Sequence, residues 1–159
     1  MYCINDCAME MIVSRHPFIK KIVSTTIDKY RNRISADANG TVVLCSEQNS
    51  EQLSAEEIKA QYFDRTGYEV FRNEVVLDQI IFKLFLSWRP IAVVIAMVKI
   101  KDILKIKMPE KAFKIIGIIE GQNLSVRFHT IREGETWLCS NIDQYTEGVF
   151  VIDTSCVYP

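Results

Sequence analysis

The chain has 159 residues, of which 48% are hydrophobic and 25% are charged, a composition typical of one folded domain and not of a disordered chain. Nineteen basic and 20 acidic residues leave a net charge of -1, so no overall positive field attracts nucleic acid, and we do not expect nucleic acid as a partner. The most hydrophobic window, residues 84–98, is interrupted by Arg89 and Pro90 and is shorter than the roughly 20 residues of a spanning helix. A membrane role is therefore not expected either.

The cysteines and the N-terminus indicate a reducing compartment. The start of the chain lacks the basic residues and long apolar run of a secretory signal. An odd number of cysteines, without a paired framework, predicts free thiols in the cytoplasm. They are Cys3, Cys7, Cys45, Cys139 and Cys156. The spacing of Cys3 and Cys7 is not that of a zinc knuckle, and we expect neither a metal nor a cofactor.

The first clear element is a helix over residues 17–33. Apolar side chains recur there at helical spacing, with charged residues between them, and Pro17 suits the first helical position because its missing N–H would be unpaired there. Asn39-Gly40 then predicts a turn, and the β-branched run Thr41–Cys45 predicts a short strand.

Two further helices are predicted before residue 90. Ser54 and Glu57 form a capping-box pattern, so a helix should begin there and end near Gly67. Asn73 can cap a second helix that stops before Pro90, because the residue ahead of a proline avoids the helical region. The latter is apolar around most of its circumference, which predicts the central buried helix of the fold.

The segment 91–107 is predicted as a strand, since it is rich in β-branched residues and its lysines alternate with apolar residues at period two. Residues 109–121 fit either a helix or a strand. The strand is slightly favoured, because Phe113, Ile115, Gly117 and Ile119 could pair with residues 124–130 through a turn at Gly121-Gln122.

The C-terminal stretch 124–153 is predicted as three antiparallel strands, joined first by a turn at Glu133-Gly134. This register puts Thr130 opposite Trp137, His129 opposite Leu138 and Phe128 opposite Cys139. One face would then be buried, and the other at least partly wet. The buried set is Val126, Phe128, Thr130, Trp137 and Cys139, and the wetter set is Arg127, His129, Ile131, Thr136, Leu138 and Ser140.

Helices in the first half and strands in the second predict an α+β fold. N-terminal helices would pack on one face of a C-terminal antiparallel sheet, a meander, within a single domain spanning residues 1–159.

One group of side chains resembles a site. Arg127 and His129 lie two residues apart on the predicted wetter face, next to Arg132, Glu133 and Glu135 at the adjoining turn. Histidine can exchange a proton near neutral pH and arginine can hold a phosphate, so a small nuclease or phosphotransfer enzyme using His129 and Arg127 is one hypothesis.

The other hypothesis is a polar surface that binds a protein partner, and we prefer it. The chain has no Gly-rich phosphate loop, no HExxH and no CxxC, and the predicted register separates Cys139 from His129. The binding residues would be Arg127, His129, Arg132, Glu133 and Glu135, with the acidic segment Glu47–Glu57 as another surface. A third hypothesis, a homodimer through an uncapped edge strand, is compatible with binding.

The helices followed by a meander, with REGETWLCSNIDQYTEGVFVID as the most distinctive portion, resemble the small immunity proteins that protect bacteria from toxins delivered by neighbouring cells in contact-dependent inhibition. Residues 109–154 carry this resemblance, and they also look similar to the NTF2-like α+β fold. The resemblance implies a non-catalytic cytoplasmic inhibitor that binds a toxin domain and blocks its active site. The near-neutral charge departs from the acidic character of many nuclease inhibitors.

Overall fold

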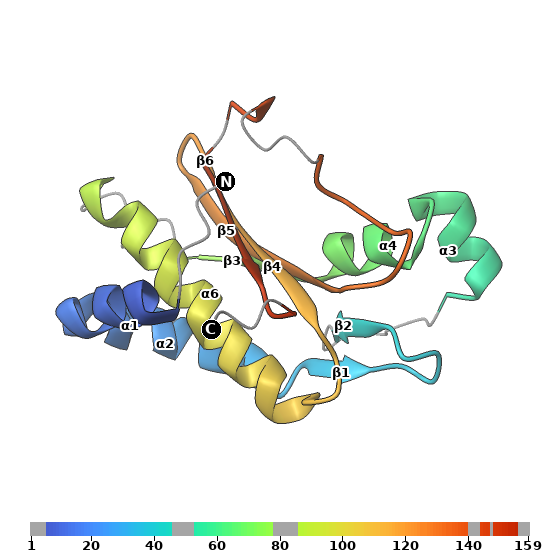
Figure 1. Cartoon of the computed structure of the whole chain (residues 1–159), viewed down its shortest axis with the longest axis horizontal. Helices are drawn as coiled ribbons and strands as arrows, with labels where there is room; N and C mark the ends of the chain where they lie inside the picture. The colour runs from blue at the N-terminus through green and yellow to red at the C-terminus, as the bar shows by residue number, and fades with distance from the viewer. Residues whose placement is uncertain (1–5, 46–52, 78–85, 140–143, 147, 156–159) are drawn as a thin grey trace.

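The computed structural model describes residues 6–45, 53–77, 86–139, 144–146 and 148–155. These residues form helices and two antiparallel sheets (Figure 1). The helices are α1 (Asp6–Arg15), α2 (Pro17–Arg31), α3 (Ala55–Tyr62), α4 (Arg65–Arg72) and α6 (Arg89–Lys107), with a 3-10 turn η1 (Leu86–Trp88). The strands are β1 (Ile34–Ala36), β2 (Val42–Leu44), β3 (Glu74–Val76), β4 (Phe113–Glu120), β5 (Asn123–Thr130) and β6 (Gly148–Asp153).

The larger sheet has the strand order β3-β5-β4-β6, and every neighbouring pair is antiparallel. Helix α6 packs on one face of this sheet, and α1 and α2 pack on α6 (Figure 1). The predicted α+β class, with N-terminal helices on one face of an antiparallel sheet, is confirmed. No helix of the described residues combines the length and the apolar character needed to cross a membrane.

Several local predictions are confirmed. Helix α2 begins at Pro17, and β2 lies inside the predicted strand Thr41–Cys45. The undecided segment 109–121 contains strand β4, which pairs with β5 from Phe113–Thr130 to Glu120–Asn123. Gly121 in the connecting turn has a φ of +54°, a conformation that glycine adopts without a steric penalty.

The predicted strand at 91–107 is wrong, because these residues form helix α6. Residues 92–97 are all buried, so the first half of the helix has no polar side that would show a helical period. In the second half the buried positions Ile100, Ile103 and Leu104 do follow helical spacing. A helix surrounded by protein cannot be recognised by alternation of polar and apolar residues.

Helix α6 approaches the sheet closely at Gly117 of β4. A Cβ atom at this position would lie 2.3 Å from Cγ1 of Val93 and 2.6 Å from Sδ of Met97, closer than side chains pack. The absence of a side chain at Gly117 therefore sets the distance between the central helix and the sheet.

The two helices predicted before residue 90 are corrected in part. The capping box at Ser54 is present, with Glu57 N–H donating to Ser54 Oγ at 3.3 Å, but α3 ends at Tyr62 and Gly67 lies inside α4. Asp64 starts that second helix by accepting a hydrogen bond from Gly67 N–H at 2.7 Å.

The predicted central helix after Asn73 is wrong at its start. Asn73 ends α4 and is followed directly by strand β3, and α6 takes the central position instead. Asn73 is fully buried, and its side chain binds neighbouring strands. The remainder of that prediction, residues 78–85, lies outside the described residues.

The predicted hairpin between residues 124–131 and 135–140 is also wrong. A turn is present, with Gly134 at a φ of +75° and Glu135 N–H donating to the Arg132 carbonyl at 3.4 Å, but residues 131–139 form no strand. Strand β5 has β4 along one edge, and on the other edge β3 pairs with residues 125–127. Beyond β3, the side chains of Asn73 and Glu69 bind the Phe128 carbonyl and the Thr130 N–H, so this edge is not free for a returning strand. Strand β6, the third predicted strand, pairs with β4 instead.

Candidate functional site

The sheet has an outer face, opposite α6, that carries the predicted site. Because the Cα–H of Gly117 that a side chain would replace faces α6, its neighbours Ile116 and Ile118 point to the outer face, together with Arg127, the partner of Ile116. His129 shares this face. The prediction that this face is partly exposed to water is wrong at these positions, because Ile116 is fully buried and His129 is buried as well.

Arg127 is held between two neighbours. Its Nη2 donates to Oε1 of Glu74 on β3 at 2.7 Å. The ring of Trp137 lies with its centroid 6.0 Å from the guanidinium carbon, at the limit of a cation–π contact. Trp137 therefore belongs to the outer face and is 38% exposed, which corrects its predicted burial next to Phe128; Cys139 is exposed as well.

His129 is 3% exposed, and its Nδ1 donates to the Thr130 carbonyl at 2.9 Å. With the proton on Nδ1, the other ring nitrogen, Nε2, is a buried acceptor that has no hydrogen-bond partner among the described residues. Burial lowers the pKa of His129 below its usual 6.5, and this outweighs the hydrogen bond to Thr130 and the nearby charge of Glu69, which raise it. The side chain is a neutral, enclosed imidazole.

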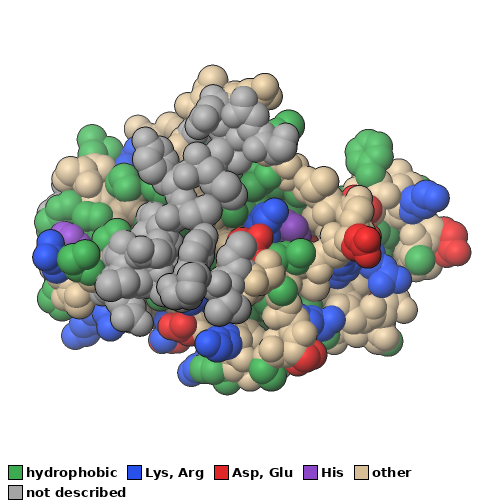
Figure 2. All heavy atoms as spheres, viewed as in Figure 1, with side chains coloured by type: hydrophobic (Ala, Val, Ile, Leu, Met, Phe, Trp, Pro, Cys, Tyr) green, Lys and Arg blue, Asp and Glu red, His purple; other side chains and the backbone are tan. Residues whose placement is uncertain are grey.

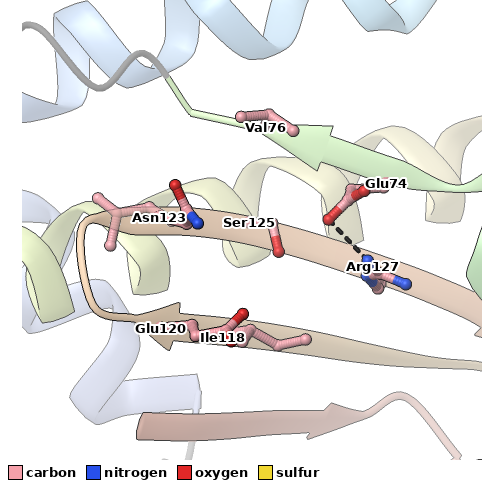
Figure 3. A pocket seen from close by; sticks show the side chains of 8 residues that line it. Glu74, Val76, Ile118, Glu120, Asn123, Ser125 and Arg127 are labelled. Atoms are coloured by element: carbon pink, nitrogen blue, oxygen red, sulfur yellow. Dashed lines mark hydrogen bonds and ion pairs between the residues drawn. The ribbon is translucent and has the colours of Figure 1, made fainter. Parts of the chain in front are cut away.

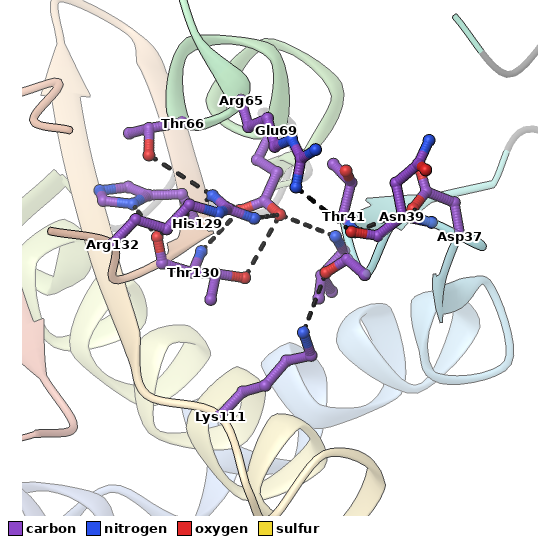
Figure 4. A network of polar contacts seen from close by, with 12 residues as sticks. Asp37, Asn39, Thr41, Arg65, Thr66, Glu69, Lys111, His129, Thr130 and Arg132 are labelled. Carbon is purple, nitrogen blue, oxygen red and sulfur yellow. Dashed lines mark hydrogen bonds and ion pairs between the residues drawn. The ribbon is translucent and has the colours of Figure 1, made fainter. Parts of the chain in front are cut away.

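A buried carboxylate, Glu69 of α4, organises the residues around the predicted turn (Figure 4). Its two oxygens accept from Arg132 Nη2 at 2.6 Å and from Arg132 Nη1 at 3.2 Å, a two-point ion pair. The same carboxylate accepts from the backbone N–H of Thr130 at 2.6 Å and of Val42 at 2.7 Å. Glu69 thus joins α4 to β5, to β2 and to the turn that follows β5.

Asn73, one helical turn after Glu69, completes this connection. Its Nδ2 donates to the Val42 carbonyl at 2.7 Å and to the Phe128 carbonyl at 3.1 Å, while its Oδ1 accepts from Leu44 N–H at 2.7 Å. Glu69 of α4 and Asn73, which directly follows that helix, therefore bind the backbone of the small sheet and of the large sheet.

The turn after β5 is anchored by a second carboxylate. Oε2 of Glu135 accepts from the Thr66 N–H at 3.0 Å and from the Thr66 hydroxyl at 2.8 Å. Thr66 lies in the first turn of α4, where backbone N–H groups lack partners inside the helix and favour negative charge. Glu133, at the tip of the turn, is exposed.

The structure therefore brings the five predicted residues together on the outer face and its adjoining turn, yet it gives them different roles. Arg127, Arg132 and Glu135 hold partners within the chain, and His129 is enclosed. Glu133 alone among these five is exposed. The other predicted surface, Glu47–Glu57, lies partly outside the described residues.

One exposed group was missed by the sequence analysis. Phe63 follows α3 directly, is 90% exposed, and has a φ of +69° and a ψ of -45°. Phe71 of α4 is 61% exposed, and its ring lies 5.3 Å from that of Tyr62. We call Tyr62, Phe63 and Phe71 the aromatic corner. Asp64, a residue that can cap a helix, was the available sequence signal that one helix ends and another begins at Phe63.

The surface around α3, α4 and the β1–β2 hairpin shows both charge signs interspersed, without a region of one sign (Figure 2). Within the described ranges, no group of three or more His, Cys, Asp or Glu side chains is arranged to hold a metal ion. Cys45 and Cys139 are free thiols.

Comparison with known proteins assigns the chain to a family. The family model described as "Uncharacterized protein PM0498 family" matches residues 4–158, so the chain belongs to this family. No curated protein and no solved structure matches the chain. The resemblance to immunity proteins and to the NTF2-like fold stays a prediction.

Proposed function

We propose that this protein is a non-catalytic binding protein of the immunity type, which neutralises a toxin domain in the bacterial cytoplasm by binding it. The observation that carries the proposal is Phe63, a large aromatic side chain that is 90% exposed on a strained backbone.

Phe63 is unfavourable for the folded chain. Its φ of +69° and ψ of -45° lie in the sparsely populated region of the strained γ-turn, which costs about 1–3 kcal/mol. The exposed ring gains almost nothing from burial in return. Strained residues that persist without a folding benefit are concentrated at sites of function. An exposed aromatic ring of this kind is a typical anchor of a protein interface.

The aromatic corner is connected to the turn at Glu133-Gly134 through the start of α4. Thr66, three residues after Phe63, binds Glu135, so the turn and the start of α4 are directly connected. Glu133 is exposed two residues before Glu135 in this turn, and we assign it to the polar rim of the anchor. In this proposal Arg132 and Glu135 position the turn, and Phe63 and Glu133 contact the toxin.

The alternative is a small nuclease or phosphotransfer enzyme that uses His129 and Arg127. A general base must come within hydrogen-bond reach of its substrate. His129 is 3% exposed, and its Nδ1 is used by the Thr130 carbonyl. We therefore prefer the binding function.

The test is protection of growth. The gene is co-expressed with the toxin domain encoded beside it, and survival is compared for the wild-type chain, Phe63→Ala and Glu133→Ala. We expect protection by the wild type, its loss with Phe63→Ala, and a weaker loss with Glu133→Ala.

Phe18→Ala is the matched control, because Phe18 is also an exposed phenylalanine, 59% exposed, but lies on α2. It should protect as well as the wild type. The proposal is wrong if no toxin is encoded nearby, or if the purified chain and that toxin domain form no complex. Equal protection by Phe63→Ala and the wild type would reject the assigned surface.

A further inference from the structure

The outer face of the sheet contains a second feature, a hollow of about 300 Å³ between β3, β5 and β4 (Figure 3). Ser125 of β5 is at its centre, because it pairs with Val76 on one side and with Ile118 on the other. Glu74 and Glu120 lie toward opposite ends, next to Arg127 and Asn123 of β5 respectively. Val76 and Ile118 thus flank Ser125 in the middle of the hollow, and one carboxylate lies toward each end.

The lining of the hollow carries two carboxylates, Glu74 and Glu120, and one guanidinium, Arg127. Arg127 donates to one oxygen of Glu74, and this pair is close to neutral. Glu120, exposed at the end of β4, takes part in no ion pair of the described residues. Among the residues that line the hollow, Glu120 is therefore the carboxylate without an ion-pair partner, while Arg89, outside the lining, donates from its Nη1 to the carbonyl of the neighbouring Gly121.

The apolar walls define the rest of the ligand. Val76 is 49% exposed although it lies in a strand of the central sheet, and Ile118 is partly exposed across from it. The two side chains flank Ser125, whose residue is 9% exposed. An aliphatic chain lying over Ser125 would cover both side chains and remove apolar surface from water.

We propose that this hollow binds a primary alkylammonium group. The ammonium would donate hydrogen bonds to the Glu120 carboxylate, and its methylene chain would lie between Val76 and Ile118. Both the end of a lysine side chain and a free aliphatic diamine have this chemistry. The site is separate from the aromatic corner, so it does not depend on the proposed toxin binding.

The experiment is a titration of the 15N-labelled full-length chain followed by amide shifts. Three probes are used: 1,5-diaminopentane for the free amine, Nα-acetyl-lysine amide for the lysine side chain, and Nα-acetyl-norleucine amide as the uncharged equivalent. We expect saturable shifts at Val76, Ile118 and Ser125 with both amines, and none with the norleucine compound. Tighter binding of the diamine would identify a free amine as the natural ligand, and tighter binding of the lysine compound a protein side chain.

Glu120→Gln removes the charge and keeps the shape, and it should weaken both amines by about five- to tenfold. Glu110→Gln is the control, because Glu110 is exposed in the turn before β4, at the other end of that strand. It should leave the affinities unchanged. Three results overturn the proposal: no saturable shift up to about 50 mM amine, equal binding of the norleucine compound, or unchanged affinity in Glu120→Gln.

Discussion

Glu69 and Arg132 form a two-point ion pair, with a closest distance of 2.6 Å, in which the Glu69 side chain is completely removed from solvent. The two residues are far apart in the sequence and come from α4 and from the turn after β5. Their contact fixes that turn against the body of the fold.

Arg132→Ala should be strongly destabilising. It leaves the carboxylate of Glu69 buried without its counter-charge, which costs about 3–5 kcal/mol. Urea unfolding followed by circular dichroism measures the effect. Arg127→Ala is the comparison, because the Arg127–Glu74 pair is partly exposed and should cost at most about 1 kcal/mol. Equal losses in the two variants would contradict the buried role of Glu69.

Gly117→Ala should separate α6 from the sheet. The added Cβ would meet Val93 and Met97 at less than 3 Å, and overpacking of this kind costs about 1–3 kcal/mol. Thermal unfolding measures the loss. The double variant with Val93→Ala should recover part of it, because the nearer contact is removed. A double variant whose unfolding temperature is no higher than that of Gly117→Ala alone would argue against this contact.

The stability of the protein should fall in mildly acidic solution because of His129. Burial keeps its folded-state pKa below 6.5, so the unfolded chain binds a proton more readily. The contribution of neutral His129 is therefore present above pH 6.5 and is lost as the pH falls from 6.5 toward the lower folded pKa. Urea midpoints measured from pH 8 to pH 5 should fall less in His129→Gln than in the wild type. Identical profiles would exclude His129 as the cause.

Phe63→Gly should stabilise the chain by up to about 1 kcal/mol, because glycine adopts a positive φ freely and little burial is lost. Phe63→Ala retains the Cβ and the strain, so its unfolding midpoint should stay close to that of the wild type. Both variants should lose toxin binding. A glycine variant that is less stable than the alanine variant would show that the ring supports the fold.

The sequence predicts some of these elements well and fails on others for identifiable reasons. Helix α2 and the capping box of α3 depend on local patterns, so they are recognisable without the fold. Residues 92–97 of helix α6 are all surrounded by protein, so this part of the helix shows no helical period. The turn at Gly134 was predicted, but the route of the chain beyond it depends on which edges of β5 are already paired.

The candidate site was also predictable only in part. Arg127, His129 and the turn residues do gather in one region, because spacing along a strand places them there. Their partners Glu69, Glu74 and Thr66 come from distant segments, and only the fold shows that these charges are satisfied internally.

The side chains that join the two sheets should slow amide exchange in the small sheet. The two sheets are separate, and the N–H groups of Val42 and Leu44 are bound by side chains of Glu69 and Asn73. Slow deuterium uptake at these two amides therefore reports on the attachment of the β1–β2 sheet to the four-stranded sheet. A variant lacking the Asn73 side chain would let Leu44 of the small sheet exchange early while the amides of β4 and β5 remain protected.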